Sequence, residues 1–251
     1  MAAGITLGNI AVTQAQFNRA GQLLFPAPLE RAVTAADDAA LFFGTTRTLR
    51  PILRAGDGAP GVSPGAVFDS LNVGTFLHDN GRFAFASQLR SVDTPTAPTR
   101  ASLWSGVGTS LVPVAIGGDV APGTSDRFSA FPGAPLVNAG GEVAFTAILD
   151  VAGSDARPNG IWMGTPGDLH LVALEGRPFD VGGGELKTVS RVDLVERPDQ
   201  LRYVLNDQGQ LRFMAFFTDG TSGVFLATVP EPGGAALVLA ALLPLVRRRR
   251  R

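Results

Sequence analysis

The 251-residue sequence has 21 Lys and Arg against 22 Asp and Glu, and 45% of its residues are hydrophobic, which excludes a disordered chain. Cysteine is absent, which excludes a disulfide framework, a thiol nucleophile and a thiolate metal site. Five of the positive charges are arginines at the C-terminus. Without them 16 basic residues oppose 22 acidic ones, a net charge of −6, so we expect no nucleic-acid partner.

The N-terminal residues 1–12 do not read as a secretory signal, because they lack a basic beginning and a sustained apolar core. They are followed by the main part of the chain, the body, in which one sequence motif recurs four times. We call this motif the repeat phrase; it occupies residues 17–25, 77–85, 137–145 and 205–213. The glycines that anchor these phrases, Gly21, Gly81, Gly141 and Gly209, are 60, 60 and 68 residues apart. A regular period of this length predicts a repeat architecture.

Each phrase has the chemistry of a β-hairpin. An apolar residue is followed by Asn or His, two further residues that are mostly small or polar, Gly and an alternating run, so a tight turn joins two strands. Further short apolar segments give about four strands per period. They include residues 67–71, 103–106, 111–115, 128–131, 160–164, 169–173, 211–217 and 223–227.

Residues 1–228 are therefore predicted to form one all-β repeat domain, and four antiparallel strands per 60 residues predict the blades of a β-propeller. The alternative architectures are a β-sandwich and an open β-solenoid. The fourth repeat has only two clear strands, so we expect residues 5–12 to complete its sheet.

Candidate chemical groups in the body are few. His78 stands where the other phrases have Asn, which favours a turn residue over a general base, and His170 alternates with leucines on a strand, which favours a solvated position. Neither has a partner at metal-ligand spacing. The sequence contains no nucleophile elbow, phosphate loop or zincin helix.

Two further sets of residues have a structural and a functional interpretation. Four loop aspartates could bind calcium, although turn formation explains them better: Asp57, Asp79, Asp119 and Asp207. Trp104 and Trp162 occupy matching repeat positions, so they either stack on sugars or, as we expect, pack in the core. The sequence thus predicts no catalytic, cofactor-binding or metal-binding residue, and a protein that is not an enzyme.

The last 23 residues, 229–251, contain three different segments in a fixed order. Pro230, Glu231 and Pro232 form a stiff polar joint, residues 233–246 are uncharged and apolar, and the arginines follow. As a helix the apolar segment is about 21 Å long, which is short for a lasting membrane span. The arginine block predicts a cytoplasmic C-terminus before any processing. It comprises Arg247, Arg248, Arg249, Arg250 and Arg251.

This arrangement resembles the PEP-CTERM sorting signal of bacterial exported proteins, which the membrane protease-transpeptidase exosortase recognises and removes. The resemblance covers about a tenth of the chain, and a buried C-terminal helix or a nucleic-acid-binding tail is the alternative. PEP-CTERM proteins normally carry an N-terminal secretory signal. We therefore expect either that the protein starts upstream of Met1 or that its C-terminal sorting signal is no longer used. The body repeats also resemble a degenerate family of bacterial exported repeat proteins of uncharacterised function.

The sequence therefore predicts an exported structural or binding protein of the cell surface or extracellular matrix, with a short C-terminal helix inserted transiently in the membrane. Its expected partners are an exosortase-type protease, the membrane through residues 233–246 and an extracellular polysaccharide. One alternative is a surface hydrolase or lyase with its active site in the propeller channel. Another is an adhesin that stays anchored by an uncleaved tail.

Overall fold

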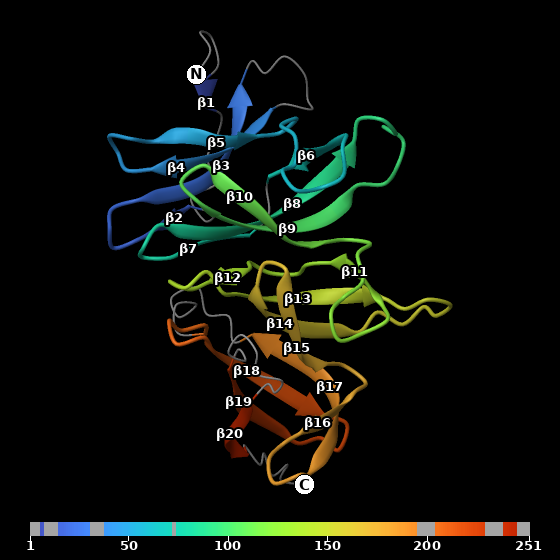
Figure 1. Ribbon diagram of the computed structural model, residues 1–251. Helices are drawn as coiled ribbons and strands as arrows, with labels where there is room; N and C mark the ends of the chain where they lie inside the picture. The colour runs from blue at the N-terminus through green and yellow to red at the C-terminus, as the bar shows by residue number, and fades with distance from the viewer. Residues whose placement is uncertain are drawn as a thin grey trace, which may run out of the picture. The chain divides into compact units, whose positions relative to one another are not determined.

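The strands of this protein come from short β-branched and aromatic runs that are bounded by glycine turns. The computed structural model describes residues 15–30, 38–71, 74–194 and 204–228, together with the backbone of residues 6–7 and 238–244. All regular structure in these residues is β, with no helix among them (Figure 1). The all-β prediction is therefore confirmed for the part of the chain that is described.

The chain divides into two compact units. The first comprises Met1–Asp119 and Gly133–Gly141, and the second comprises Val120–Pro132 and Glu142–Arg251. The first unit contains two sheets, made by the first and second repeats, and the short strand β12 (Leu136–Val137). The second unit contains the sheets of the third and fourth repeats.

In the first unit, each sheet is an antiparallel meander whose strands follow one another in chain order. The first sheet has the order β1-β3-β4-β5, with β2 also paired to β3, and the second has the order β6-β8-β9-β10, with β7 also paired to β8. The strands of the first sheet are β1 (Thr6–Leu7), β2 (Gln16–Phe17), β3 (Leu23–Glu30), β4 (Ala39–Gly44) and β5 (Arg50–Arg54). Those of the second are β6 (Ala66–Ser70), β7 (Thr75–Leu77), β8 (Arg82–Ser91), β9 (Arg100–Val107) and β10 (Ser110–Ile116).

The second unit repeats the same plan. Its first sheet has the order β11-β13-β14-β15, and its second has the order β16-β17-β18-β19-β20. The strands of the former are β11 (Arg127–Ala130), β13 (Val143–Asp150), β14 (Asn159–Thr165) and β15 (Asp168–Leu174). Those of the latter are β16 (Pro178–Asp180), β17 (Leu186–Leu194), β18 (Gln210–Phe217), β19 (Ser222–Thr228) and β20 (Val238–Pro244).

An aromatic pair marks the centre of every sheet. In each sheet, a phenylalanine that follows the repeat turn is paired across the strands with a second aromatic residue. The four pairs are Phe25 with Phe42, Phe85 with Trp104, Phe145 with Trp162 and Phe213 with Phe225. Their ring centroids are 5.4 to 6.5 Å apart, which is within the range of favourable aromatic contact. Each repeat of the sequence thus contributes the same aromatic contact to its sheet as well as the same turn.

The core of the first unit lies between its two sheets. In the first unit, Leu24 and Leu41 of the first sheet belong to one buried cluster with Phe83, Phe85 and Trp104 of the second. Each of these side chains is 1% exposed or less. The two sheets therefore pack against each other through this cluster, which removes their apolar side chains from water.

Two predictions about the ends of the repeat domain are wrong. Thr6 and Leu7 pair with Glu30 and Leu29 of β3, so the N-terminal strand completes the first sheet and not the fourth. In the fourth sheet, β20 pairs antiparallel with β19. Residues 238–244 are therefore a strand where the sequence predicts a short helix, because the edge of β19 offers backbone hydrogen bonds to a segment of seven residues.

Candidate functional site

The four repeat phrases fold into the same tight turn. In all four, the amide of the anchoring glycine donates a hydrogen bond to the carbonyl of the residue three positions before it, as Gly21 does to Asn18 at 3.1 Å. The glycines have φ angles of 68° to 92°, a conformation that side chains disfavour. In the first and fourth repeats, the carboxamide oxygen of the asparagine also accepts a hydrogen bond from the amide four residues later. The hairpin interpretation of the phrase is confirmed.

His78 takes the asparagine position in the second turn, as predicted. Its amide donates to the carbonyl of Arg82 at 2.8 Å, and its carbonyl accepts from Gly81 at 3.0 Å. The imidazole Nδ1 lies 3.0 Å from Oδ1 of Asn80, which in turn accepts the amide hydrogen of Arg82. In the second turn Asn80, held by His78, accepts the amide hydrogen that a single asparagine accepts in the first and fourth turns. The histidine therefore stabilises a turn.

Hydrogen bonds in the first unit join successive turns to one another. Asn18, which is 1% exposed, donates from Nδ2 to the carbonyl of His78 at 3.0 Å. Sixty residues further along, Asn80 and Arg82 both donate to the carbonyl of Ala139, at 3.1 and 3.0 Å. Of these donors Asn18 is buried and Asn80 is exposed, and together the hydrogen bonds link consecutive repeats.

The two tryptophans are core residues. Trp104 and Trp162 are both fully buried, with 0% exposure, so neither offers a face to a sugar. The indole Nε1 of Trp104 donates to Ser102 Oγ at 2.9 Å, and that of Trp162 donates to the carbonyl of Pro122 at 3.0 Å. The packing interpretation holds, and the stacking platform is excluded.

The remaining residues with a possible chemical role lie in exposed contacts. His170 Nε2 is 3.3 Å from Asp168 Oδ1 at the start of β15. Asp57 accepts the amide of Arg54 at 2.7 Å, and Asp119 pairs with Arg100 at 2.9 Å. Among the described residues, no group of three His, Asp or Glu side chains is placed to hold a metal ion.

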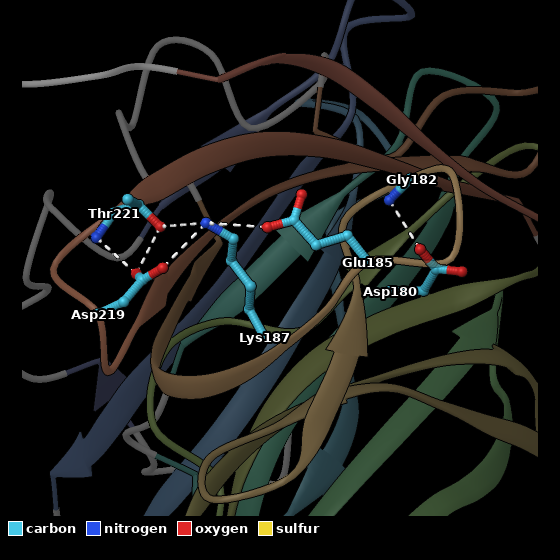
Figure 2. Close-up of polar contacts among 6 residues, drawn as sticks. All are labelled: Asp180, Gly182, Glu185, Lys187, Asp219 and Thr221. Carbon is cyan, nitrogen blue, oxygen red and sulfur yellow. Dashed lines mark hydrogen bonds and ion pairs between the residues drawn. The ribbon is translucent and has the colours of Figure 1, made fainter.

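A further polar cluster surrounds Lys187, the one lysine of the chain, and no motif in the sequence predicts it. Lys187 Nζ lies 2.9 Å from Asp219 Oδ2, 3.1 Å from Thr221 Oγ1 and 3.6 Å from Glu185 Oε1 (Figure 2). The other carboxylate oxygen of Asp219 accepts the hydroxyl and the amide of Thr221, at 2.6 and 2.9 Å. The cluster joins β17 to the turn between β18 and β19.

The pKa values of Asp219 and Lys187 favour a structural role over acid–base catalysis. We call the ion pair and its hydrogen bonds a clamp, because they hold β17 to the turn between β18 and β19. The Thr221 hydroxyl, Lys187 and the Thr221 amide lower the pKa of Asp219 to about 2, so the carboxylate is ionised at neutral pH. The hydrogen bond to Asp219 raises the pKa of Lys187, so the ammonium keeps its proton. A general acid or base needs a pKa near the working pH, and neither group meets that condition.

Replacement of Thr221 by valine is expected to raise the pKa of Asp219 toward its ordinary value of 3.8, because the largest cause of the lowered pKa is removed. Carboxyl carbon shifts in an NMR titration from pH 1.5 to 6 measure this directly. Thr218→Val removes a nearby hydroxyl and keeps the Thr221 bonds, so its titration is the control. An unchanged midpoint in the Thr221 variant would contradict the assignment.

The lowered pKa of Asp219 also determines how the stabilising contribution of the clamp depends on pH. Because the folded pKa of Asp219 lies below the ordinary value, the clamp is complete above pH 3.8 and is lost as the pH falls through about 2. The raised pKa of Lys187 preserves the pair up to and beyond its ordinary value of 10.5. The clamp therefore works across the whole physiological range.

The residues predicted for the sorting signal lie outside the described residues. These are Pro230, Glu231, Pro232 and the arginines from Arg247 to Arg251. In the part of the chain that is described, no helix has the length and apolar character that a membrane crossing requires.

Three solved structures similar to the chain are glycosidases. They are an α-L-arabinanase of Penicillium chrysogenum complexed with arabinobiose, a GH43 β-1,3-galactosidase with galactodeoxynojirimycin, and an α-L-arabinofuranosidase of Fusarium graminearum with an iminosugar inhibitor. The identities are 12%, 10% and 11%, and the TM-scores are 0.38, 0.36 and 0.32. The similarity covers 94%, 90% and 97% of this chain and 68%, 74% and 77% of theirs.

The prediction that the protein is not an enzyme is contradicted by these similarities, since all three similar structures are enzymes by name, and it is withdrawn. At such identities and TM-scores the likeness transfers no substrate and no catalytic residue to this chain.

A comparison with curated protein sequences finds no match. Residues 1–236 do match one protein family as a whole, which is described as a family of unknown function, DUF7453. This match spans the four repeats and ends two residues before β20. The chain therefore belongs to the DUF7453 family.

Proposed function

We propose that this protein is exported to the cell surface or extracellular matrix, and that its last 23 residues are a sorting signal that an exosortase-type protease recognises and cleaves. The observation that carries the proposal is the order of three segments in the sequence: Pro230-Glu231-Pro232, the apolar residues 233–246 and the arginine block. A stiff joint, a short apolar stretch and a cytoplasmic basic stop suit a temporary hold in the membrane during cleavage.

The body is proposed to work outside the cytoplasm as a β-propeller or a related repeat of four-stranded sheets. The meander order within each sheet and the packing of one sheet face on the next within a unit both support this architecture. Stability without disulfides is compatible with export, because the sheets bury an extensive aromatic core.

The proposal predicts removal of the tail. When the gene is expressed in a bacterium that possesses an exosortase, mass spectrometry of the surface fraction is expected to find a C-terminus that lacks Arg247–Arg251. Replacement of Pro230, Glu231 and Pro232 by alanine is expected to leave the full-length chain in the membrane fraction. An exosortase-deficient strain is the matched control.

The opposite result has a definite meaning. An intact terminus in the surface fraction of the exosortase-bearing strain would contradict processing and favour a permanently anchored adhesin. Cleavage that continues in the alanine variant would contradict the role of the Pro-Glu-Pro joint.

A surface hydrolase is the second candidate for the activity of the body. Hydrolysis of a glycosidic bond normally requires two carboxyl groups roughly 5 to 9.5 Å apart on either side of the scissile bond. The names of the similar structures supply assay substrates, arabinan and β-1,3-galactan. Release of reducing sugar by the purified chain would support hydrolysis, whereas retention on immobilised polysaccharide without release would support binding.

A further inference from the structure

The apolar segment of the tail has a second place in the molecule, as the outer strand of the fourth sheet. Residues Val238–Pro244 pair antiparallel with β19, from Val238 opposite Thr228 to Pro244 opposite Gly223. Figure 1 shows β20 beside β19 at the C-terminal end of the chain. In the other three repeats this position is held by β5, β10 and β15.

The pairing of β20 reproduces a detail of the other outer strands. In every sheet the register shifts by one residue beside the aromatic residue at the sheet centre: Phe42, Trp104, Trp162 and Phe225. The extra residue on the outer strand is Ile52, Val114, Val172 and, in β20, Leu242. A bulge is a specific feature of strand pairing, so residues 238–244 occupy the position of a regular repeat strand.

The connection to β20 differs from the others in length and composition. Two residues join β9 to β10, and two join β14 to β15, so these outer strands are fixed by tight hairpins. Nine residues, 229–237, separate β19 from β20, and they include the Pro-Glu-Pro joint and two glycines. Closing a connection of nine residues costs more chain entropy than closing one of two. β20 is also the last strand in the order of its sheet, so its departure frees a single edge.

We propose that the outer edge of β19 is a reversible binding site for the apolar segment of the tail. The edge holds residues 238–244 as a strand while the protein is in water, and releases them when the tail enters a membrane. This inference rests on the proposed sorting function of the tail. Its reason is physical: an apolar segment in water needs a partner for its backbone, whereas in lipid a helix satisfies every backbone group internally.

The absence of cysteine makes the site accessible to disulfide trapping. Leu226 and Ala240 are direct partners across the two strands, whereas Leu239 pairs with Ala227. The full-length variant Leu226→Cys with Ala240→Cys is expected to form an intramolecular disulfide under mild oxidation. The variant Leu226→Cys with Leu239→Cys is the matched control, because neighbouring strand residues point to opposite faces, and it is expected to cross-link several-fold less.

Release is tested with unilamellar vesicles of phosphatidylglycerol and phosphatidylcholine. The reduced Leu226/Ala240 variant is expected to bind the vesicles and, while bound, to lose several-fold in cross-linking yield. The oxidised variant is expected to bind several-fold less than the reduced one, and a reductant is expected to restore binding.

Three outcomes overturn the inference: equal cross-linking of the partner and control pairs in water, undiminished cross-linking in protein that is bound to vesicles, or vesicle binding that is measurable and equal for the oxidised and reduced protein. Failure of the sorting function looks different. In that case the wild-type chain does not bind vesicles and keeps its C-terminus in the exosortase-bearing strain, although the partner pair still cross-links in water.

Discussion

Replacement of Trp162 by alanine is expected to lower the free energy of unfolding by about 3 to 5 kcal/mol, the usual cost of deleting a large buried aromatic side chain. Trp162 is fully buried between Phe128, whose ring centroid is 5.2 Å away, and Phe145 at 6.3 Å. Its indole also satisfies the carbonyl of Pro122. The cavity and the unpaired carbonyl both destabilise the folded state.

Two controls make the measurement specific. Trp162→Phe is expected to cost about 1 to 3 kcal/mol, because an aromatic ring remains, although its smaller size leaves a cavity and the carbonyl of Pro122 loses its donor. Phenylalanine already occupies this position in the first and fourth sheets. Leu186→Ala removes a side chain that is 65% exposed and is expected to change stability by less than about 0.5 kcal/mol.

Urea unfolding followed by circular dichroism measures these differences, and tryptophan fluorescence assigns them to a unit. Trp104 lies in the first unit and Trp162 in the second, so the tryptophan that remains in the Trp162→Ala variant reports the first unit alone. A loss below about 1 kcal/mol for Trp162→Ala would contradict the core position of the ring.

The second large effect is expected at Gly164, where alanine should cost about 2 to 5 kcal/mol. Gly164 has a φ of 144°, and a Cβ atom there would overlap the backbone carbonyl oxygen of Asp168. Gly44 is its equivalent in the first sheet, with a φ of 142° and Thr48 O only 2.6 Å from the position of a Cβ. The backbone cannot yield as a flexible side chain would, so both strain and overlap persist.

Gly167 provides the matched control in the same hairpin. Its φ is 90°, but no atom lies within 4 Å of a Cβ placed there. Gly167→Ala is therefore expected to cost about 1 kcal/mol, from backbone strain alone. Fluorescence of Trp162 during urea unfolding distinguishes the two variants, and equal destabilisation would contradict the overlap at Gly164.

The sequence predicts most of the body correctly because the repeat makes its signals redundant. The phrase around Gly81 predicts a turn, and its recurrence around Gly21, Gly141 and Gly209 predicts four. Matching repeat positions then predict that Trp104 and Trp162 pack in the core, where the structure has them. Local chemistry repeated at a fixed period is thus enough to predict strands, turns and much of the core.

The errors fall where the prediction depends on pairing over long distances. Thr6–Leu7 and Val238–Pro244 both form strands, but composition does not specify their partners. The apolar run of the tail suits a helix as well as a strand, since it lacks a period that separates the two. A comparison of residues 240–244 with the outer-strand residues 112–116 and 170–174 would have given a signal, because all three runs are short and mainly apolar.

The Lys187 cluster also depends on strand pairing over a long distance, so a local sequence pattern does not predict it. Asp219 and Thr221 lie more than 30 residues from Lys187, and the contact exists only because β17 and β18 pair. One sequence signal does point to it, since a single lysine in a chain with twenty arginines is unusual. An ammonium is compact enough to approach Asp219 and Thr221 together, whereas a guanidinium is larger and planar.

The outer strands of the first unit carry a proline opposite the central aromatic residue. Pro51 lies opposite Phe42, and Pro113 lies opposite Trp104. A proline has no amide hydrogen to offer to an approaching strand, so β5 and β10 are poor templates for edge-to-edge association. The prolines therefore protect these two edges of the first unit against pairing with a strand of another molecule.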